Sequence, residues 1–202
     1  MSPSRITAQP ASEIASLRIE LVDSDPLIWR EVEVPTSITL TTLHQIVQAA
    51  MGWFDYHLWE FRVGGKTYGL PMDEDWGTEP RQEAANTRLA EVLKAGRTVI
   101  GYTYDMGDDW AHKLVVSDVR PADEKLSYPR YVAGRGACPP EDCGGLPGFY
   151  WLLEARADQS RPDHAEAQEQ LGDYDPDEID ELSIALELGR IGQPTRTARK
   201  TR

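Results

Sequence analysis

Two cysteines and two histidines of this sequence have the types and spacing of a metal site. Cys138 and Cys143 are separated by four residues within residues 128–149, a segment that prolines and glycines would fold back tightly. Cysteine and histidine are ligands of structural zinc, which takes four of them in a tetrahedron. Together with the distant His57 and His112, the chain supplies that number. We therefore predict a structural zinc ion bound by Cys138, Cys143, His57 and His112.

The same four residues have a simpler interpretation, which the sequence leaves open. Unpaired cysteines are often small buried side chains that pack a loop, and a histidine on the apolar face of a strand is often a core residue. A nucleophilic thiol is not indicated, because a thiolate needs a neighbouring base or cation. Arg135 lies near both cysteines in the sequence, but Glu141 and Asp142 oppose its charge.

A second cluster consists of three carboxylates within five residues. Asp105, Asp108 and Asp109 lie between two predicted strands, and His112 follows them. Oxygen-rich clusters hold Mg²⁺ or Ca²⁺ and support metal-assisted hydrolysis. The alternative is a hairpin turn, in which the aspartates bond to their own backbone and Gly107 takes a positive φ. The sequence contains no phosphate-binding loop, dinucleotide fingerprint, serine-nucleophile elbow or zinc-protease helix motif.

Hydrophobic periodicity predicts the strands and helices that position these side chains. Alternating apolar and polar residues predict strands at 17–22, 28–34, 57–63, 66–70, 98–104 and 110–116. Apolar residues spaced three and four apart predict helices at 42–51, 89–93, 148–157, 163–171 and from 175 to about 189.

The first and the last of these helices carry the clearest end signals. Thr39 or Thr41 can cap the first helix, and Gly52 can close it. His44 lies beside its apolar stripe and is expected on the helix surface. The last helix is expected to begin at Asp175, followed by proline. It is expected to bury a stripe formed by Ile179, Leu182, Leu186 and Leu188.

The order of elements predicts an α+β fold. It reads ββαββ, a short helix, ββ, and then a helical C-terminal part at residues 147–189. Strand pairs separated by a helix indicate an antiparallel or mixed sheet, and a β-grasp-like arrangement fits the first block. Residues 128–149 hold too many prolines and glycines for a strand interior. We expect a stiff loop there.

The length of 202 residues predicts one folded domain with two loose ends. We place this single domain at residues 15–189. Residues 1–14, rich in Ser, Pro and Ala, are expected to form a disordered leader, and residues 190–202 a disordered basic tail. Residues 71–84 are acidic and rich in turn formers, and are expected to form an exposed excursion that contains Trp76.

Charge and hydropathy exclude several classes of partner. The net charge of −13 argues against wrapping a nucleic-acid backbone, so nucleic acid is expected only at the basic tail. No apolar run approaches the roughly 18 to 20 residues that cross a bilayer. The N-terminus lacks the apolar core of a secretory signal. We therefore expect a cytoplasmic protein with reduced thiols and no membrane contact.

Six runs of residues form a recognisable set. They are Ile-Trp-Arg at 28–30, Leu-His-Gln-Ile-Val-Gln-Ala-Ala-Met-Gly-Trp at 43–53, His-Leu-Trp-Glu-Phe at 57–61, Tyr-Asp-Met-Gly-Asp-Asp-Trp-Ala-His at 104–112, Tyr-Pro-Arg-Tyr at 128–131 and Gly-Ala-Cys-Pro-Pro-Glu-Asp-Cys-Gly-Gly at 136–145. Together they resemble a known family, the plasmid pRiA4b open-reading-frame-three-like proteins. The last run is the most specific, and the resemblance extends over about residues 15 to 185. Met106 stands where the family pattern has Phe.

The resemblance implies an α+β fold and a bacterial, plasmid- or transposon-associated setting. Relatives are labelled as passenger (TnpR-type) proteins of insertion elements. The resemblance implies no particular chemistry. With no recognised catalytic set, we expect a non-enzymatic interaction or accessory module for an unidentified macromolecular partner. Two alternatives stay open: a metal-dependent hydrolase or nuclease using Asp105, Asp108, Asp109 and His112, and a DNA-transaction accessory that binds through the basic tail.

Overall fold

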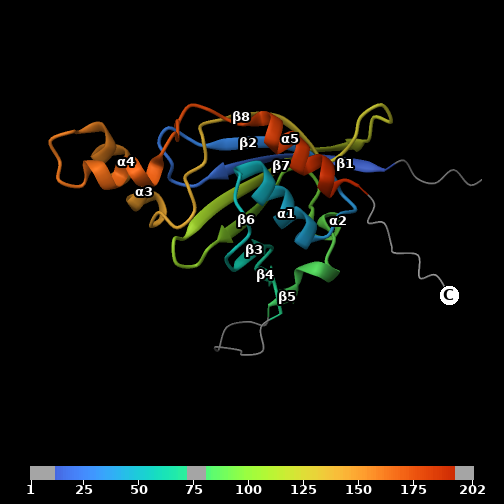
Figure 1. Cartoon of the computed structure of the whole chain (residues 1–202). Helices are drawn as coiled ribbons and strands as arrows, with labels where there is room; N and C mark the ends of the chain where they lie inside the picture. Colours follow the sequence, from blue (N-terminus) through green and yellow to red (C-terminus); the bar gives the residue numbers. More distant parts are fainter. Residues whose placement is uncertain (1–11, 72–80, 194–202) are drawn as a thin grey trace, which may run out of the picture.

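Figure 1 shows the computed structural model of the chain, which describes residues 12–71 and 81–193. These residues form an α+β fold in which α1 and α5 lie across one face of an eight-stranded sheet, with α3 and α4 beyond one end (Figure 1). The strands are β1 (Glu13–Leu21), β2 (Trp29–Pro35), β3 (Trp59–Val63), β4 (Lys66–Gly69), β5 (Gln82–Glu83), β6 (Thr98–Tyr104), β7 (Trp110–Pro121) and β8 (Arg130–Arg135). The helices are α1 (Leu40–Met51), the 3-10 turn η1 (Ala84–Asn86), α2 (Leu89–Val92), α3 (Gly145–Ala157), α4 (His164–Leu171) and α5 (Glu181–Ile191).

The strand order in the sheet is β5-β4-β3-β6-β7-β1-β2-β8. Neighbouring strands are antiparallel except β4 and β5, so the sheet is mixed, as expected. The β-grasp-like arrangement of the first block is not confirmed, because β6 and β7 lie between its two hairpins. The pairing of β1 with β7 joins segments far apart in the chain, and local periodicity carries no information on such pairing.

The expectation that residues 128–149 hold no strand was wrong. β8 pairs antiparallel with β2, with Arg135 opposite Trp29. As the last strand of the sheet, β8 needs hydrogen-bond partners on one side only, which is where breaker residues are tolerated. Its glycine permits a close approach: a Cβ on Gly134 would lie 2.9 Å from Cδ of Arg30.

α1 begins and ends where the cap signals predict. The Thr39 hydroxyl accepts a hydrogen bond from the Thr42 amide at 3.1 Å. Gly52 closes the helix in the left-handed conformation, with φ of 84°, which glycine adopts without a steric cost. The buried face includes Leu43, Ile46, Val47 and Ala50. Full burial of each larger side chain stabilises the fold by roughly 1.5–3 kcal/mol.

His44 is buried in the core, so the expectation that it lies on the helix surface was wrong. Its ring stacks on Trp59 with centroids 4.0 Å apart. Nε2 lies 2.7 Å from Asp55 Oδ1 and Nδ1 lies 2.8 Å from the Tyr102 hydroxyl. Because both ring nitrogens have partners, the imidazole is accommodated without an unpaired polar group. Burial lowers the pKa of His44, against the opposing effect of Asp55.

α5 begins later than predicted. The Asp175 carboxylate accepts a hydrogen bond from the Asp177 amide and forms a local turn instead of a helix cap. The cap is Asp180, which accepts from the amide of Ser183 at 2.9 Å. Both aspartates precede residues able to enter a helix. Packing of the segment against α1 and β8 selects the later start.

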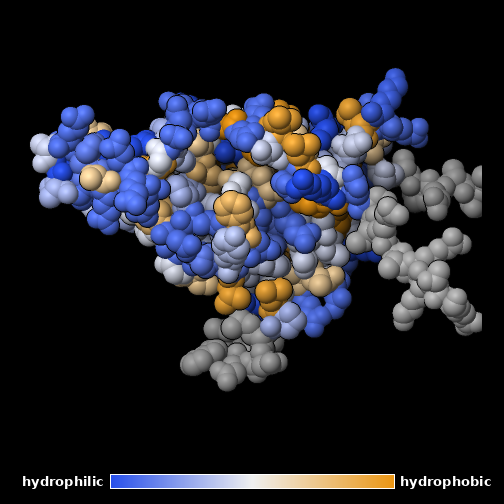
Figure 2. Space-filling view, viewed as in Figure 1, coloured by the Kyte–Doolittle hydropathy of each residue, from blue (hydrophilic) through white to orange (hydrophobic). Residues whose placement is uncertain are grey.

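The buried face of α5 differs in part from the prediction. Leu188 is buried as expected, but Ile184 is the other buried side chain, whereas Leu182 and Leu186 are 71% and 57% exposed. Apolar side chains accordingly gather over α5 on an otherwise largely hydrophilic face (Figure 2). Shifting the helix start changes which residues face inward, because each residue turns the helix by about 100°.

The folded part extends beyond the predicted domain limits of 15 and 189. β1 begins at Glu13 and α5 reaches Ile191. The remaining leader and tail residues, and residues 72–80 of the acidic excursion with Trp76, lie outside the described residues. Within the described part of the chain, no helix is long and apolar enough to cross a membrane.

Candidate metal centre

Three side chains from distant parts of the chain converge beside the turn between β6 and β7. His57 precedes β3, Asp105 follows β6, and Asp142 lies in the loop before α3. His57 Nε2 is 2.9 Å from Asp142 Oδ1 and 3.6 Å from Asp105 Oδ2. The three potential ligand atoms all lie within 4.8 Å of one another. Residues 12–71 and 81–193 contain no other group of three His, Cys, Asp or Glu side chains gathered this closely.

The Nε2 atom of His57 is sequestered from solvent and poorly paired. Although it is close to two carboxylate oxygens, it forms no well-directed hydrogen bond with any described residue. Its bonding direction therefore points at neither oxygen. A buried polar atom without a partner calls for a physical explanation, such as an ion or an ordered water. A cation between Nε2 and the two carboxylates would accept the nitrogen lone pair and neutralise both acids.

The backbone of the β6–β7 turn orients Asp105. Its Oδ1 accepts from the amides of Gly107 at 2.8 Å and Asp108 at 3.4 Å. Its φ of 54° is in the left-handed region that aspartate tolerates better than most residues. One carboxylate oxygen thus builds the turn, and the other faces His57. The predicted Asx-type turn is thus present at Asp105, and its second carboxylate oxygen is left free of the turn.

Asp108 and Asp109 lie outside the cluster. Asp108 Oδ2 accepts from the Gly144 amide at 3.1 Å, which joins the β6–β7 turn to the cysteine-bearing loop. Asp109 has φ of 53° and its amide donates to the Asp105 carbonyl at 2.8 Å. Both residues shape loops, as in the alternative interpretation of the acidic run, but the positive φ expected at Gly107 was wrong, because Asp105 and Asp109 take that conformation instead.

The loop that carries Asp142 is held by its neighbours. Glu141 accepts hydrogen bonds from the Tyr104 hydroxyl and, at 2.9 Å, from the Phe54 amide. The Trp53 indole donates to the carbonyl of Pro139 at 2.9 Å. Glycines then admit a close turn into α3, since a Cβ on Gly145 would lie 2.4 Å from the Asp108 carbonyl oxygen.

His112 lies in the core and not in the cluster. It is 3% exposed on β7, and its Nδ1 is 2.8 Å from the Trp110 carbonyl oxygen. Its Nε2 has no hydrogen-bond partner among the described residues. Burial lowers the pKa of His112 to about 4, so the ring is neutral at neutral pH. This placement corresponds to the core-histidine interpretation.

The two cysteines are unpaired and do not gather with the imidazoles of the predicted quartet into a close ligand group. Cys143 is buried, with Sγ 3.9 Å from the Gly145 carbonyl oxygen, and Cys138 is partly buried. Burial raises the pKa of the Cys143 thiol to about 12 and also raises that of Cys138. No three of Cys138, Cys143, His57 and His112 form a close ligand group in the described chain.

The sequence contained both halves of the observed cluster but not their combination. His57 came from the predicted zinc quartet and Asp105 from the predicted acidic site, while Asp142 was considered only for its charge. The signal for Asp142 is its place between a proline pair and a glycine pair. Such a tight loop presents a short side chain at a fixed point, and Asp142 holds a φ of 57° there.

The chain has related proteins of known sequence and structure. It matches the family described as "Plasmid pRiA4b ORF-3-like protein" over residues 13–183. The uncharacterized protein y4hQ of Sinorhizobium fredii (strain NBRC 101917 / NGR234) is 38% identical over 166 residues, which are 82% of this chain and 84% of that protein. A crystal structure of MM3350, a protein of unknown function from Methanosarcina mazei Go1, has a TM-score of 0.78 at 30% identity. That match covers 87% of this chain and 99% of MM3350.

Proposed function

The chain belongs to the plasmid pRiA4b ORF-3-like protein family, and we propose that it is an accessory module whose 138–145 loop is fixed by a divalent cation. The ligands are His57 Nε2 and one oxygen each from Asp105 and Asp142. The observation that carries this proposal is the buried, undirected Nε2 atom beside two carboxylates. Through the ion, the loop becomes a rigid surface for a macromolecular partner.

The donor set suggests which cations fit. One imidazole and two carboxylates suit Zn²⁺ or Mn²⁺ better than a thiolate-selective ion. Ligand atoms about 2.0–2.2 Å from a tetrahedral ion lie about 3.3–3.6 Å from one another. Asp105 Oδ2 is already 3.6 Å from His57 Nε2, whereas Asp142 Oδ1, at 2.9 Å, would move slightly outward to admit the ion. In this proposal the ion is bound by His57, Asp105 and Asp142 instead of by Cys138, Cys143, His57 and His112. As in the zinc prediction, it joins the loop to the sheet.

The state of the thiols supports a binding role over thiol catalysis. Cys143 is buried, Cys138 is partly buried, and both thiols have raised pKa values, so neither is a ready nucleophile at neutral pH. Asp108 and the Glu141 contacts already hold the loop close to the β6–β7 turn. A cation would add a third link at the exposed end of the loop, where His57 is the only described residue that pairs with the Asp142 side chain.

Metal titration of two matched variants tests the proposal. Asp142 and Asp109 both have positive φ, and asparagine tolerates that conformation, so Asp142→Asn and Asp109→Asn carry equal backbone risk. We expect calorimetry with Zn²⁺ or Mn²⁺ to give one equivalent for the wild type and Asp109→Asn, and none for Asp142→Asn. At a hundredfold excess over Kd, the ion should stabilise the fold by about 3 kcal/mol. Equal binding by all three proteins would refute it.

A metal-dependent hydrolase is the second candidate. Its support is that three protein ligands leave coordination positions open, as in catalytic zinc sites, and that the Asp142 side chain is 68% exposed. The assay is hydrolysis of a phosphodiester such as bis-p-nitrophenyl phosphate by the metal-loaded protein. Turnover lost in Asp105→Asn but retained in Asp109→Asn would favour the enzyme over the module. Asp108, Asp109 and His112 have no ligand role in this version.

The basic tail gives the third candidate, an accessory to DNA transactions. Residues 194–202 lie outside the described residues, whereas α5 continues to Ile191. The truncation that tests the idea should therefore remove only residues 194–202, since a cut at 190 would shorten α5. Equal DNA affinity with and without these residues, or no affinity in either protein, would discard this candidate.

A further inference from the structure

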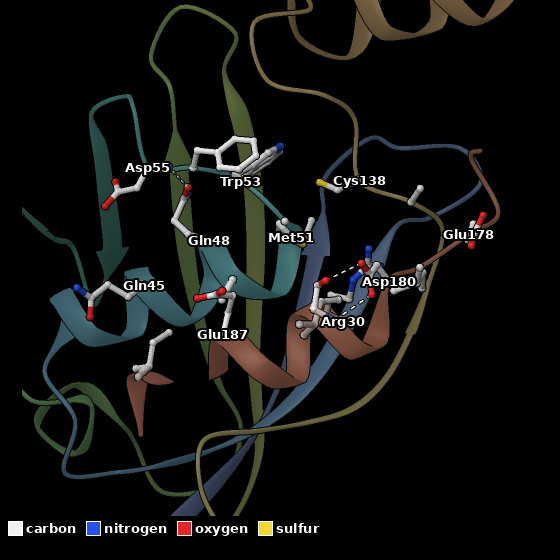
Figure 3. Close-up of a pocket in the computed structure, with 18 residues that line it drawn as sticks. Arg30, Gln45, Gln48, Met51, Trp53, Asp55, Cys138, Glu178, Asp180 and Glu187 are labelled. Atoms are coloured by element: carbon white, nitrogen blue, oxygen red, sulfur yellow. Dashed lines mark hydrogen bonds between the residues drawn. The ribbon is translucent and has the colours of Figure 1, made fainter. Parts of the chain in front are cut away.

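A second site lies between α1 and α5, in a cavity of about 710 Å³ that none of the three proposed ion ligands lines. Gln45, Gln48 and Met51 reach it from α1 and Glu187 from α5, while Cys138 borders it from the loop (Figure 3). Small-molecule sites have volumes of roughly 300–1,000 Å³. The cavity is therefore large enough for a ligand.

Arg30 of β2 lines this cavity with a buried charge. The residue is 2% exposed. Its Nε donates to the Ala50 carbonyl at 3.0 Å, and Nη1 donates to the carbonyls of Trp29 at 2.9 Å and Arg135 at 3.2 Å. These acceptors fix the plane of the guanidinium but carry no negative charge. In the described chain, Nη2 has no hydrogen-bond acceptor and no carboxylate lies within ion-pair distance of Arg30.

A buried charge without a counter-ion is unusual, because buried charges are normally paired. Burial lowers the pKa of Arg30, and the neighbouring Cys138 is the largest of the opposing influences. Glu181 also raises this pKa through its charge, but it forms no ion pair with Arg30, and its Oε1 accepts a hydrogen bond from the Tyr131 hydroxyl at 3.1 Å. An arginine stays protonated despite such shifts. The missing partner of Arg30 is thus an anion that fits a planar guanidinium.

The rest of the cavity has the opposite charge. Its lining includes the four acidic residues Asp55, Glu178, Asp180 and Glu187 and, among the described residues, no lysine and no second arginine. A dianionic phosphate would be repelled by this rim. A neutral ligand would leave Arg30 unpaired. A ligand with one carboxylate and one ammonium group satisfies both parts.

Three of the rim carboxylates already have partners. Asp55 is bonded to His44, Asp180 caps α5, and Glu187 pairs with Arg190. Glu178 makes no side-chain hydrogen bond or ion pair with any described residue, and it lines the cavity. Glu178 is therefore the acid available to an ammonium group.

From this pairing we propose that the cavity binds a small amino carboxylate, with the carboxylate on Arg30 and the ammonium group at Glu178. The guanidinium offers Nη2 to one carboxylate oxygen. Met51, Trp53 and Ile184 supply apolar wall for the methylene groups between the two charges. The site is independent of the proposed cation, because the two sets of residues do not overlap.

Calorimetry on the full-length chain with three probes of matched length tests the proposal. The probes are 6-aminohexanoate, hexanoate and hexylamine, titrated in the presence of a chelator so that the metal centre does not contribute. We expect 6-aminohexanoate to bind at least about tenfold more tightly than either singly charged probe. Inorganic phosphate should not compete. Equal binding of hexanoate, or displacement by phosphate, would overturn the assignment.

Variants separate the two ends of the ligand. Arg30→Met should abolish binding of both carboxylate probes, and Arg30→Lys should retain weakened binding because the charge stays while the planar fork is lost. Glu178→Gln should remove the preference for 6-aminohexanoate over hexanoate. The matched control is Glu169→Gln, an exposed α4 residue that does not line the cavity.

A second measurement, on the wild type alone, tests the site even if the Arg30→Met variant does not fold. In two-dimensional NMR of the wild type, 6-aminohexanoate should shift the Arg30 side-chain signal and the Ala50 and Glu178 amides. Shifts confined to the surface of α4, or no shifts at millimolar probe, would refute the site.

Discussion

The candidate metal centre and the Arg30 cavity have unbalanced charges of opposite sign, with excess carboxylates at the first and, among the described residues, an unpaired guanidinium at the second. At the first, the carboxylates of Asp105 and Asp142 lie beside the imidazole of His57, and the Asp142 side chain is largely exposed. At the second, a buried guanidinium that forms no ion pair with a described residue lines a cavity. The segment 137–143 borders both, because Cys138 lines the cavity and Asp142 belongs to the cluster. If both proposals hold, this segment separates two ligand sites of opposite charge.

The largest effect should come from disturbing the segment that the two sites share. A Cβ on Gly148 of α3 would lie 1.9 Å from the Cys143 carbonyl oxygen. Gly148→Ala should therefore displace the loop and destabilise the fold by about 3 kcal/mol, and both ligands should bind more weakly. Chemical denaturation measures the loss. Gly189→Ala in α5 is the control, since a Cβ there meets nothing within 4 Å. Unchanged binding at both sites in Gly148→Ala would break the comparison.

Acid should lower the free energy of unfolding through His112, which lies in the core beneath both sites. Its ring is edge-on to that of Trp53, with the ring centroids 5.2 Å apart. Its pKa is about 4 in the fold, against about 6.5 in an unfolded chain. As the pH falls, the imidazole is therefore protonated at a higher pH in the unfolded chain than in the folded one, and this favours unfolding. Stability is fully present above pH 6.5 and falls by about 3 kcal/mol as the pH drops toward 4.

Denaturation of His112→Phe over the same pH range checks this expectation. The variant should lose most of the acid sensitivity, with a remainder from His44, whose pKa is also lowered by burial. His164→Gln, on α4, should retain it in full. Identical pH profiles for His112→Phe and the wild type would contradict the prediction.

Removing one tie of the shared loop should have a smaller effect. Glu141→Ala deletes the acceptor for the Tyr104 hydroxyl and the Phe54 amide, and hydrogen bonds to a charged acceptor are worth about 1.5–3 kcal/mol. Because Glu141 is partly exposed, a loss near 1.5 kcal/mol is expected in thermal or chemical denaturation. Glu124→Ala, an exposed residue, is the control. If metal affinity falls while 6-aminohexanoate binding is unchanged, the loop is not shared.

The smallest effect belongs to the exposed rim. Glu187 pairs with Arg190 at a largely solvent-exposed site, and such pairs contribute roughly 0–1 kcal/mol. Glu187→Gln should leave the free energy of unfolding within about 0.5 kcal/mol of the wild type and weaken 6-aminohexanoate binding less than Glu178→Gln does. If Glu187→Gln weakens 6-aminohexanoate binding more than Glu178→Gln does, the ammonium group lies at Glu187 on α5 and not at Glu178.

Much of the local structure was predictable, because it depends on neighbours in the chain. The alternating strands, the Thr39 cap and the Gly52 stop of α1 all follow from local backbone and side-chain preferences. The errors lie where distant packing decides. β8 forms because β2 offers an edge. α5 starts at Asp180 and not at the predicted Asp175, and His44 is buried because Asp55 and Tyr102 satisfy its ring.

The sequence by itself determined the α+β class, the family and the residue types available for chemistry, since these depend on periodicity, turn residues and ordered motifs. Only the tertiary structure decided which of those residues meet. It placed His57 with Asp105 and Asp142 instead of with the cysteines, and it left Arg30 facing a cavity. The physical reason is that a ligand site requires side chains to be positioned to within about an ångström, although they come from segments about fifty to a hundred residues apart. Strand pairing and loop packing set those positions, and the local sequence pattern does not.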